Sequence, residues 1–367
     1  MHGSRYKTDC FHFNGFKPCA AHKENRTECE SCDVYRPLDF RILIIKTGAA
    51  GDVVRTTPLL HRLKKLYPQA EITWVTHYPE LLPSAVDHIL RFSWENCMAL
   101  MDQFFNIVIN LDKSLPETTL AMRVQSGEIK GFVSDQNGKI LPADKNALHK
   151  WSTGFNDTQM LANQRHYVEE LFEICGWEFE GETYWINEKA PFSGPTLKGE
   201  KTLIGLNTGC GDRWPTRLWP IEHFIELSRL LQDDGFEVVL LGGPMEDLRN
   251  IEIAEKSGAR YDGVKPLLEF TSLVAQCDLL VTSVTMALHL AIAFEKKIIL
   301  MNNIFPTNEF HLYGLGKIIE PQLGCKYCFK SSFDSNCETT SCMGLISPSQ
   351  IQSEIRRSFP LFGSLIS

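Results

Sequence analysis

The chain has 367 residues, of which 43% are hydrophobic and 22% charged, and its formal net charge is −8. These proportions are ordinary for a globular protein, and the length suffices for two domains that each bury a core. The acidic balance argues against a surface built for nucleic acid. No stretch approaches the ~18 apolar residues of a membrane-spanning helix, and the N-terminus lacks the apolar core of a signal peptide, so we expect a cytoplasmic protein.

Residues 1–38 form a cysteine-rich segment ahead of the first predicted strand. It contains Cys10, Cys19, Cys29 and Cys32, and the last two are close enough in sequence for both sulfurs to reach one metal ion. In a cytoplasmic protein, metal ligation is favoured over disulfide formation. A structural zinc ion held by four thiolates is the default interpretation. Iron is the alternative, and reduced thiols or redox-formed disulfides are the interpretations without a metal.

Residues 41–58 have the pattern of a buried strand, a glycine turn and a helix start. The apolar run Ile42–Ile45 suits a parallel strand that is covered on both faces. Gly48 and Gly51 permit a tight turn, and Asp52 then falls at or near the helix N-terminus. The glycines match neither a P-loop nor the dinucleotide fingerprint, which argues against a nucleotide on this loop. Because such turns line ligand sites in open α/β sheets, Asp52 is a candidate for chemistry. The alternative is that it only caps its helix.

Strands and helices alternate along the rest of the chain in two blocks, residues 39–190 and 200–320, joined by a linker rich in proline and glycine at 190–199. Further strands are expected at Glu71–Thr76, His88–Phe92, Phe105–Asn110 and Ile129–Val133 in the first block, and at Thr202–Asn207, Glu237–Leu241, Asp278–Thr282 and Lys297–Met301 in the second. Helices of the second block are expected near Ile221–Leu231, Glu246–Ser257, Leu267–Cys277 and Thr285–Phe294. The prediction is an α/β protein with two Rossmann-like domains that face each other across a cleft.

The loop that follows the first strand of the second block is suited to an anion. Residues 208–220 combine glycines with Thr208, Arg213 and Arg217 ahead of a helix that Pro220 can begin. Backbone N–H groups, the helix dipole and guanidinium groups together favour a phosphate. The alternative is that both arginines are ordinary surface charges.

Two later strand-to-helix turns carry further candidates. Glu246 lies near a helix start, where it could accept hydrogen bonds from a ribose or merely cap the helix. Ser283 and Thr285 offer hydroxyl groups at the next helix opening. His289 lies one helical turn further on and is interpreted either as a ligand contact or as a satisfied, half-buried histidine.

A second cysteine group follows the last predicted strand in a finger-like segment, residues 321–346. Cys325, Cys328, Cys337 and Cys342 again include one Cys-x-x-Cys pair, so the same zinc or iron interpretation applies. The sequence leaves open whether the two groups form two sites or exchange ligands. A helix is expected over residues 347–367.

Four motifs occur in a fixed order between about residues 40 and 355: I-I-K-x-G-A-x-G-D-V-x-x-T-x-P-x-L-x-x-L-K, W-P-T-R-x-W-P, G-G-P-x-E and T-x-x-T-x-x-x-H-L-A. Together they resemble glycosyltransferase family 9, the ADP-heptose-dependent heptosyltransferases. The resemblance implies a GT-B fold with an acceptor domain followed by a nucleotide-sugar domain. It also implies sugar transfer with inversion and without a catalytic metal. Some relatives, the autotransporter heptosyltransferases, are similar in carrying a C-terminal cysteine finger that holds iron.

The same resemblance implies roles for individual residues. Asp52 is the expected general base, on an acceptor-side loop with Gly48 and Gly51. The donor contacts that we expect, from the resemblance and from the anion loop, are Thr208, Gly209, Arg213, Arg217, Glu246, Ser283, Thr285, Met286, His289 and Glu309.

This chain departs from the family pattern in the last motif. Where the family usually has an acidic residue and a glycine, the chain has Val284 and Met286. The acidic residue is associated with recognition of the donor sugar, so the sugar, heptose or another, stays open. Asn302, Asn303 and Glu309 are hypothesised to supply a substitute polar wall.

The sequence therefore predicts an inverting glycosyltransferase that uses ADP-heptose or a related nucleotide sugar. The acceptor is expected to be a glycan, lipopolysaccharide-like or protein molecule, recognised by first-block loops such as Trp151–Gln164. We expect at most peripheral membrane contact, and homo-oligomer formation stays open. One alternative is a catalytically degenerate sugar-nucleotide or glycan binder, which Val284 favours but Asp52 and Arg217 oppose. A zinc-module nucleic-acid binder is disfavoured because charges nearly balance in residues 1–38.

Overall fold

The computed structural model describes residues 5–194, 196–197, 199–211, 215–323, 327 and 342–359. They form two compact units. The first unit comprises the described residues up to Thr47 together with Leu59–Pro79 and Ala85–Leu148. The second comprises Gly48–Pro58, Glu80–Ser84 and the described residues from His149 onward. The glycine turn with Asp52 thus belongs to the second unit, although it directly follows a strand of the first.

The first unit contains a 6-stranded sheet in the order β3-β2-β1-β4-β5-β6, in which only the β5–β6 pair is antiparallel. Its strands are β1 (Arg41–Ile45), β2 (Glu71–Thr76), β3 (His88–Arg91), β4 (Phe104–Asn110), β5 (Gln125–Ser134) and β6 (Ile140–Pro142). The five strands expected in this block are confirmed. The three-residue β6 was not predicted, because it is too short to show an alternating pattern.

Helices cover this sheet, as the burial of β1 requires. α4 (Trp94–Met101) and α5 (Leu115–Arg123) pack on one face of β1 and β4, where Leu100 and Leu120 meet Leu43 and Val108. α3 (Leu59–Leu66) presents a buried apolar stripe and ends in two lysines. Among residues 5–40, the part of this segment that the structure describes, the helical elements are α1 (Ala20–Asn25) and a short 3-10 turn, Cys29–Ser31.

The chain leaving β1 is fixed by a buried polar cluster in the first unit. Thr47 donates its backbone N–H to Asp112 at 2.6 Å and its hydroxyl to Glu117 at 2.6 Å. Lys46 forms an ion pair with the same Asp112. Because these side chains are buried and paired, the chain enters the glycine turn from a fixed point.

The second unit contains a 5-stranded, all-parallel sheet in the order β11-β10-β9-β7-β8. Its strands are β7 (Leu203–Asn207), β8 (Glu237–Leu241), β9 (Leu279–Thr282), β10 (Lys297–Met301) and β11 (Gly316–Ile319). Of these, only the four-residue β11 was not predicted. The chain runs from β7 outward to β8 and then returns to β9 on the other side of β7, so the switch point of the sheet lies between β7 and β9.

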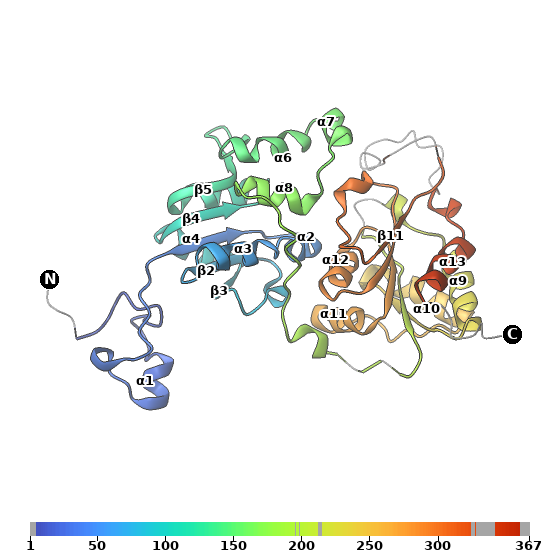
Figure 1. Ribbon diagram of the computed structural model, residues 1–367, viewed down its shortest axis with the longest axis horizontal. Coiled ribbons are helices and arrows are strands. Elements are labelled where there is room, and N and C mark those ends of the chain that lie inside the picture. The colour runs from blue at the N-terminus through green and yellow to red at the C-terminus, as the bar shows by residue number, and fades with distance from the viewer. Residues whose placement is uncertain are drawn as a thin grey trace. The chain divides into compact units, whose positions relative to one another are not determined.

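Helices lie on both faces of this second sheet (Figure 1). α11 (Leu267–Gln276) and α12 (Met286–Ala293) lie on one face, and α9 (Ile221–Asp233), α10 (Asp247–Ser257) and α13 (Pro348–Ser358) lie on the other. The second group shares a continuous core with the strands, in which Phe224, Ile253 and Ile351 are buried. The four helices expected in this block are confirmed to within a few residues, and α13 corresponds to the described part of the expected C-terminal helix.

Between β6 and β7 in chain order come α6 (Leu148–Thr153), α7 (Asp157–Ala162) and α8 (Tyr167–Ile174). The interpretation of Trp151–Gln164 as a loop is wrong, since this stretch includes the end of α6 and all of α7. The Asn156 side chain caps α7 by accepting the backbone N–H of Gln159 at 3.1 Å, a start signal that was overlooked. Within the part of the chain that the structure describes, no helix has the length and apolar content required to cross a bilayer.

Candidate active site

The turn that carries Asp52 forms the short helix α2 (Ala50–Val54), which packs against α12 of the same unit. A Cβ atom at Gly51 would lie 2.7 Å from Cδ2 of His289 and 3.2 Å from Cα of Met286, so only glycine fits at this contact. The N-cap of α2 is Ala49, which places Asp52 in the first turn of the helix rather than at its cap. The hypothesis that Asp52 is only an N-cap is therefore wrong, and its neighbour Gly51 lies against the first turn of α12.

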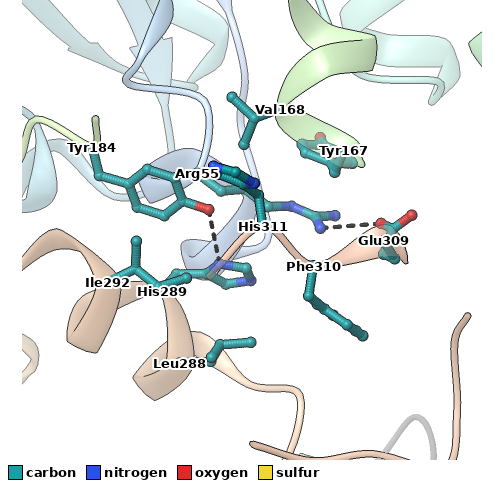
Figure 2. Close-up of a pocket in the computed structure, with 10 residues that line it drawn as sticks. All are labelled: Arg55, Tyr167, Val168, Tyr184, Leu288, His289, Ile292, Glu309, Phe310 and His311. Atoms are coloured by element: carbon teal, nitrogen blue, oxygen red, sulfur yellow. Dashed lines mark hydrogen bonds and ion pairs between the residues drawn. The ribbon is translucent and has the colours of Figure 1, made fainter. Parts of the chain in front are cut away.

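A guanidinium group connects Asp52 to Glu309. Arg55 Nη2 lies 2.8 Å from Asp52 Oδ1, and Arg55 Nη1 lies 3.2 Å from Glu309 Oε1. The same guanidinium stacks 3.3 Å above the centroid of the Tyr167 ring at the start of α8 (Figure 2). Burial alone lowers the pKa of Arg55, but the two carboxylates outweigh it and raise the pKa, so the group stays charged. Arg55 thus holds a permanent positive charge next to the Asp52 carboxylate, which is 33% exposed.

Sequence analysis did not identify Arg55, although a local signal was present. It lies three residues after Asp52, a spacing at which opposite charges meet on a helix. The partner Glu309 is 254 positions away, and no local pattern could have joined the two.

The His289 side chain of α12 is buried against α2, with Nδ1 3.5 Å from the hydroxyl of Tyr184. Burial, followed by the nearby charge of Arg55, lowers the pKa of His289 to about 3. Burial raises the pKa of Tyr184, which therefore keeps its proton. His289 is thus a neutral packing residue at neutral pH, and of its two interpretations the structure favours the satisfied buried histidine.

These side chains enclose a small cavity of about 10 Å³, lined by Arg55, Tyr167, Val168, Tyr184, Leu288, His289, Ile292, Glu309, Phe310 and His311 (Figure 2). This volume accommodates about one water molecule and no sugar nucleotide. The residues around it therefore form a packed support for Arg55 and Asp52.

The turns after β7 and β9 meet at the switch point of the second sheet. The Asn207 side chain donates to the Gly209 carbonyl oxygen at 3.2 Å and to the Thr282 hydroxyl at 3.1 Å. The Ser283 hydroxyl donates to the same Gly209 oxygen at 3.3 Å. Asn207 was not among the predicted site residues, although an amide at the end of a buried strand needs partners there.

Arg217 ties the same two turns together from a third position. It is 7% exposed, and its guanidinium donates to the backbone carbonyl groups of Cys210 and Val284. The interpretation of Arg217 as a surface charge is therefore wrong. Arg213, its predicted companion, lies outside the described residues.

Thr208 and Glu246 shape the turn at Gly209. The Thr208 hydroxyl donates to the Asn250 side chain of α10, and its backbone N–H donates to the Leu241 carbonyl oxygen at 3.1 Å. Glu246 accepts the backbone N–H of Gly243 at 2.8 Å, so it does cap the turn before α10. Its carboxyl group occupies the space that a Cβ at Gly209 would need. Glycine at 209 thus allows an acidic side chain to lie against the backbone of the anion loop.

Thr285 and Met286 open α12. The Thr285 hydroxyl caps the helix by accepting the Ala287 backbone N–H at 3.2 Å. Because the N-terminus of a helix attracts anions, this opening next to Asp52 can hold negative charge.

Asn302, Asn303 and Glu309, hypothesised to form a polar wall in place of the family's acidic residue, have partners inside the second unit. Asn302 donates to the Phe305 carbonyl oxygen at 2.7 Å, and Asn303 donates to the Thr216 carbonyl oxygen at 2.8 Å. Both residues are buried, whereas Glu309 pairs with Arg55. The two asparagines thus brace their own loops.

The cysteine groups differ in what the structure describes. Cys10, Cys19, Cys29 and Cys32 are free thiols that line one cavity of about 510 Å³ in the first unit. Cys325, Cys328 and Cys337 lie outside the described residues, and Cys342 is buried in the core of the second unit. Among the described residues no three cysteine, histidine or acidic side chains are arranged to hold a metal ion, so the predicted zinc arrangement is not observed.

The fold and the switch-point turns define a Rossmann-like α/β protein with a candidate ligand site at the carboxyl ends of β7 and β9. The model of glycosyltransferase family 9 (heptosyltransferase) matches residues 96–317, more than half of the chain. The chain therefore belongs to this family, and the resemblance seen in the four motifs is confirmed.

Relatives agree with this assignment. Lipopolysaccharide heptosyltransferase 1 of Escherichia coli (strain K12) is 26% identical over 310 residues, which cover 76% of this chain and 92% of the relative. The structure of E. coli heptosyltransferase WaaC with ADP-2-deoxy-2-fluoro heptose matches with a TM-score of 0.61 at 18% identity, covering 87% of this chain and 100% of the other. Iron-containing dodecameric glycosyltransferase TibC from enterotoxigenic E. coli H10407 matches with a TM-score of 0.54 at 14% identity, covering 91% and 82%. The two structural likenesses show a shared GT-B type fold.

Proposed function

We propose that this glycosyltransferase transfers heptose from ADP-heptose to a lipopolysaccharide-like glycan, with inversion and with Asp52 as the general base. The observation that carries the proposal is the packing of the Asp52 turn on the first turn of α12. This packing supports a donor site near Asp52, because the N-terminus of a helix suits a diphosphate. The E. coli relative named as lipopolysaccharide heptosyltransferase 1 supports the sugar and the acceptor.

The proposed reaction is a single displacement at the anomeric carbon of the donor. Asp52 removes the proton of the acceptor hydroxyl as its oxygen forms a bond to the anomeric carbon. The bond from that carbon to the diphosphate oxygen breaks, and its electron pair leaves with the nucleotide diphosphate. The new glycosidic bond therefore has inverted configuration, and the proton remains on Asp52 until solvent takes it up.

Arg55 has a positioning role in this scheme. Its guanidinium lies 2.8 Å from one oxygen of Asp52 and so orients the carboxylate. Since Glu309 and Tyr167 hold Arg55 in turn, the carboxylate is oriented before the acceptor binds.

The leaving diphosphate is proposed to bind at the turns around the switch point. The opening of α12 at Thr285 and Met286 supplies backbone N–H groups and the helix dipole. The turn of Thr208 and Gly209 contributes further backbone groups, and Arg217 fixes the distance between the two turns through its carbonyl contacts. Glu246 is proposed to accept a hydrogen bond from a ribose hydroxyl.

The donor sugar is tested by a binding and turnover screen. Intact protein is titrated with ADP-heptose, ADP-glucose, GDP-mannose and UDP-glucose, with ADP alone as the control, and thermal stabilisation and acceptor-dependent release of the nucleotide are measured. We expect ADP-heptose to stabilise the protein beyond ADP and to turn over. Stabilisation only by GDP- or UDP-sugars would refute the proposed donor, and binding without turnover would support the degenerate binder instead.

Glu309 supports Asp52 through its ion pair with Arg55, and the further hypothesis that it also reads the donor sugar has its own test. Val284 offers no acidic contact, so the Glu309→Ala variant should raise the dissociation constant of ADP-heptose more than that of ADP. The Glu309→Gln variant keeps the size of the side chain and separates lost charge from lost packing. Unchanged affinity in Glu309→Ala would remove this residue from the donor site.

A further inference from the structure

The segment ahead of β1 has no hydrophobic core of its own. Between residues 5 and 40, all of which the structure describes, no residue is buried. The segment contains one six-residue helix and one three-residue turn. So little buried surface does not compensate the conformational entropy that a fixed chain loses, and small modules of this kind are usually stabilised by disulfides or a metal.

The two ends of this segment are nevertheless fixed. Phe11 donates its backbone N–H to the Arg36 carbonyl oxygen at 2.8 Å, and Leu38 donates to the Asp9 carbonyl oxygen at 2.8 Å. The Arg36 guanidinium lies 3.4 Å from the centroid of the Phe11 ring, which itself stacks on His88 of β3. The segment is therefore a closed module anchored on the edge of the first sheet.

The interior of the module is a cavity that all four of its cysteines line. Cys10, Cys19, Cys29 and Cys32 all border the same space of about 510 Å³. Their thiols form no disulfide. A volume of this size falls within the roughly 300–1,000 Å³ that is typical of sites for small molecules and cofactors.

A closed site for a single ion would differ from this arrangement. Four thiolates on one zinc ion lie about 2.3 Å from it, so their sulfur atoms almost touch and leave no cavity. Here no three potential ligands among the described residues are arranged around a common ion position. Four thiols around a larger space instead match a group that presents several metal atoms, each of which takes one thiolate.

The charges around the cavity are compatible with an anionic group. Arg5, Lys7 and Lys17 line it together with the single carboxylate Glu28, which lies 3.9 Å from Arg5. A four-iron, four-sulfide cluster with four thiolate ligands carries net negative charge. The aromatic side chains that border the same cavity can shield such a cluster from water.

We propose that Cys10, Cys19, Cys29 and Cys32 bind a [4Fe–4S] cluster, which serves as the core of the N-terminal module. The cluster has a structural role and takes no part in sugar transfer. The cluster proposal is independent of the proposed function, so either proposal can be refuted while the other stands.

The test uses the full-length chain, purified without oxygen, and measures iron, acid-labile sulfide and zinc per chain. The variant Cys325→Ser/Cys328→Ser disables the C-terminal cysteine group, so any sulfide that it retains belongs to the N-terminal one. We expect this variant to hold about four irons and four sulfides, with the Mössbauer spectrum of a cubane cluster. One zinc or one iron without sulfide, or no metal at all, would overturn the proposal.

The matched variant Cys19→Ser/Cys29→Ser should hold about four irons and four sulfides fewer than the wild type. Its thermal stabilisation by ADP should persist, which shows that the second unit is folded. Equal sulfide content in this variant and the wild type would also overturn the proposal. If the variant cannot be obtained folded, the Cys325→Ser/Cys328→Ser protein still decides the outcome.

Discussion

At the scale of single residues, the site depends on Arg55, which joins the proposed base to Glu309. Two carboxylates and one guanidinium meet where little water reaches, since the Arg55 and Glu309 side chains are only 14% and 10% exposed. Such a group is stable only as a unit, because removal of one member leaves an uncompensated charge.

The interaction between Arg55 and Glu309 can be measured directly. Arg55→Met should lower the free energy of unfolding by about 3–5 kcal/mol, since it leaves the buried Glu309 carboxylate unpaired. Glu309→Gln in the same chain should restore part of this loss. The double variant should therefore lose less unfolding free energy than the two single variants lose together. Urea denaturation of the wild type, the two single variants and the double variant gives the four unfolding free energies. Strict additivity would show that the pair contributes no interaction energy.

His289 makes stability depend on pH. Its pKa is about 3 in the folded chain against an ordinary 6.5, so between these values the unfolded chain binds a proton that the folded chain does not. The stability that this difference contributes is fully present above about pH 6.5 and is lost as the pH falls towards 3. The total loss in free energy of unfolding is at most about 5 kcal/mol.

The pH profile of unfolding free energy tests this assignment. Between pH 7 and about pH 4, the free energy of unfolding should fall less in His289→Gln than in the wild type. The same change at the exposed His77 should leave the wild-type profile unaltered. Parallel profiles for wild type and His289→Gln would contradict a neutral, buried His289.

At the scale of elements, the contact between α2 and α12 positions the proposed base. Sequence analysis found β1, the glycine turn and α12 because their signals are local: an apolar run, two glycines and a helix cap. It could not show that the turn packs on α12, since Gly51 and His289 are far apart in sequence. For the same reason Arg55, Asn207 and Tyr184 were not recognised, because each acts through a partner brought close only by the fold.

Gly51→Ala tests this contact. The added Cβ would overlap the His289 ring and approach the backbone of Met286, so we expect about 1–3 kcal/mol of destabilisation. Displacement of Asp52 should also reduce the transfer rate, roughly 10²-fold. Gly344→Ala is the control, because its Cβ would make only an ordinary contact with Pro220 at 3.4 Å. If both variants behaved like the wild type, α2 would not be held by this contact.

At the scale of the whole molecule, the two sheets confirm the predicted α/β architecture, but the compact units do not follow the predicted linker at residues 190–199. Sequence order alone assigns residues 48–58 and 149–190 to the first block. In the structure they cluster with the second sheet. The proline and glycine content of a segment predicts a linker, but tertiary packing decides with which sheet each segment clusters. The second unit therefore holds Asp52, Arg55 and the switch-point turns together.

This arrangement predicts transfer that does not depend on a divalent cation. The helix opening at Thr285 and the turn at Gly209 can neutralise the leaving diphosphate without a metal. Initial rates with excess EDTA should equal those with magnesium. A rate that falls with EDTA and recovers on addition of magnesium would refute this part of the mechanism.

The most direct test of the account is Asp52→Asn, which keeps the size of the side chain and removes the base. Transfer from ADP-heptose under single-turnover conditions should fall by about 10²–10⁴-fold, while the dissociation constant of the donor stays the same. If Asp52→Asn transferred the sugar as fast as the wild type, Asp52 would not be the general base.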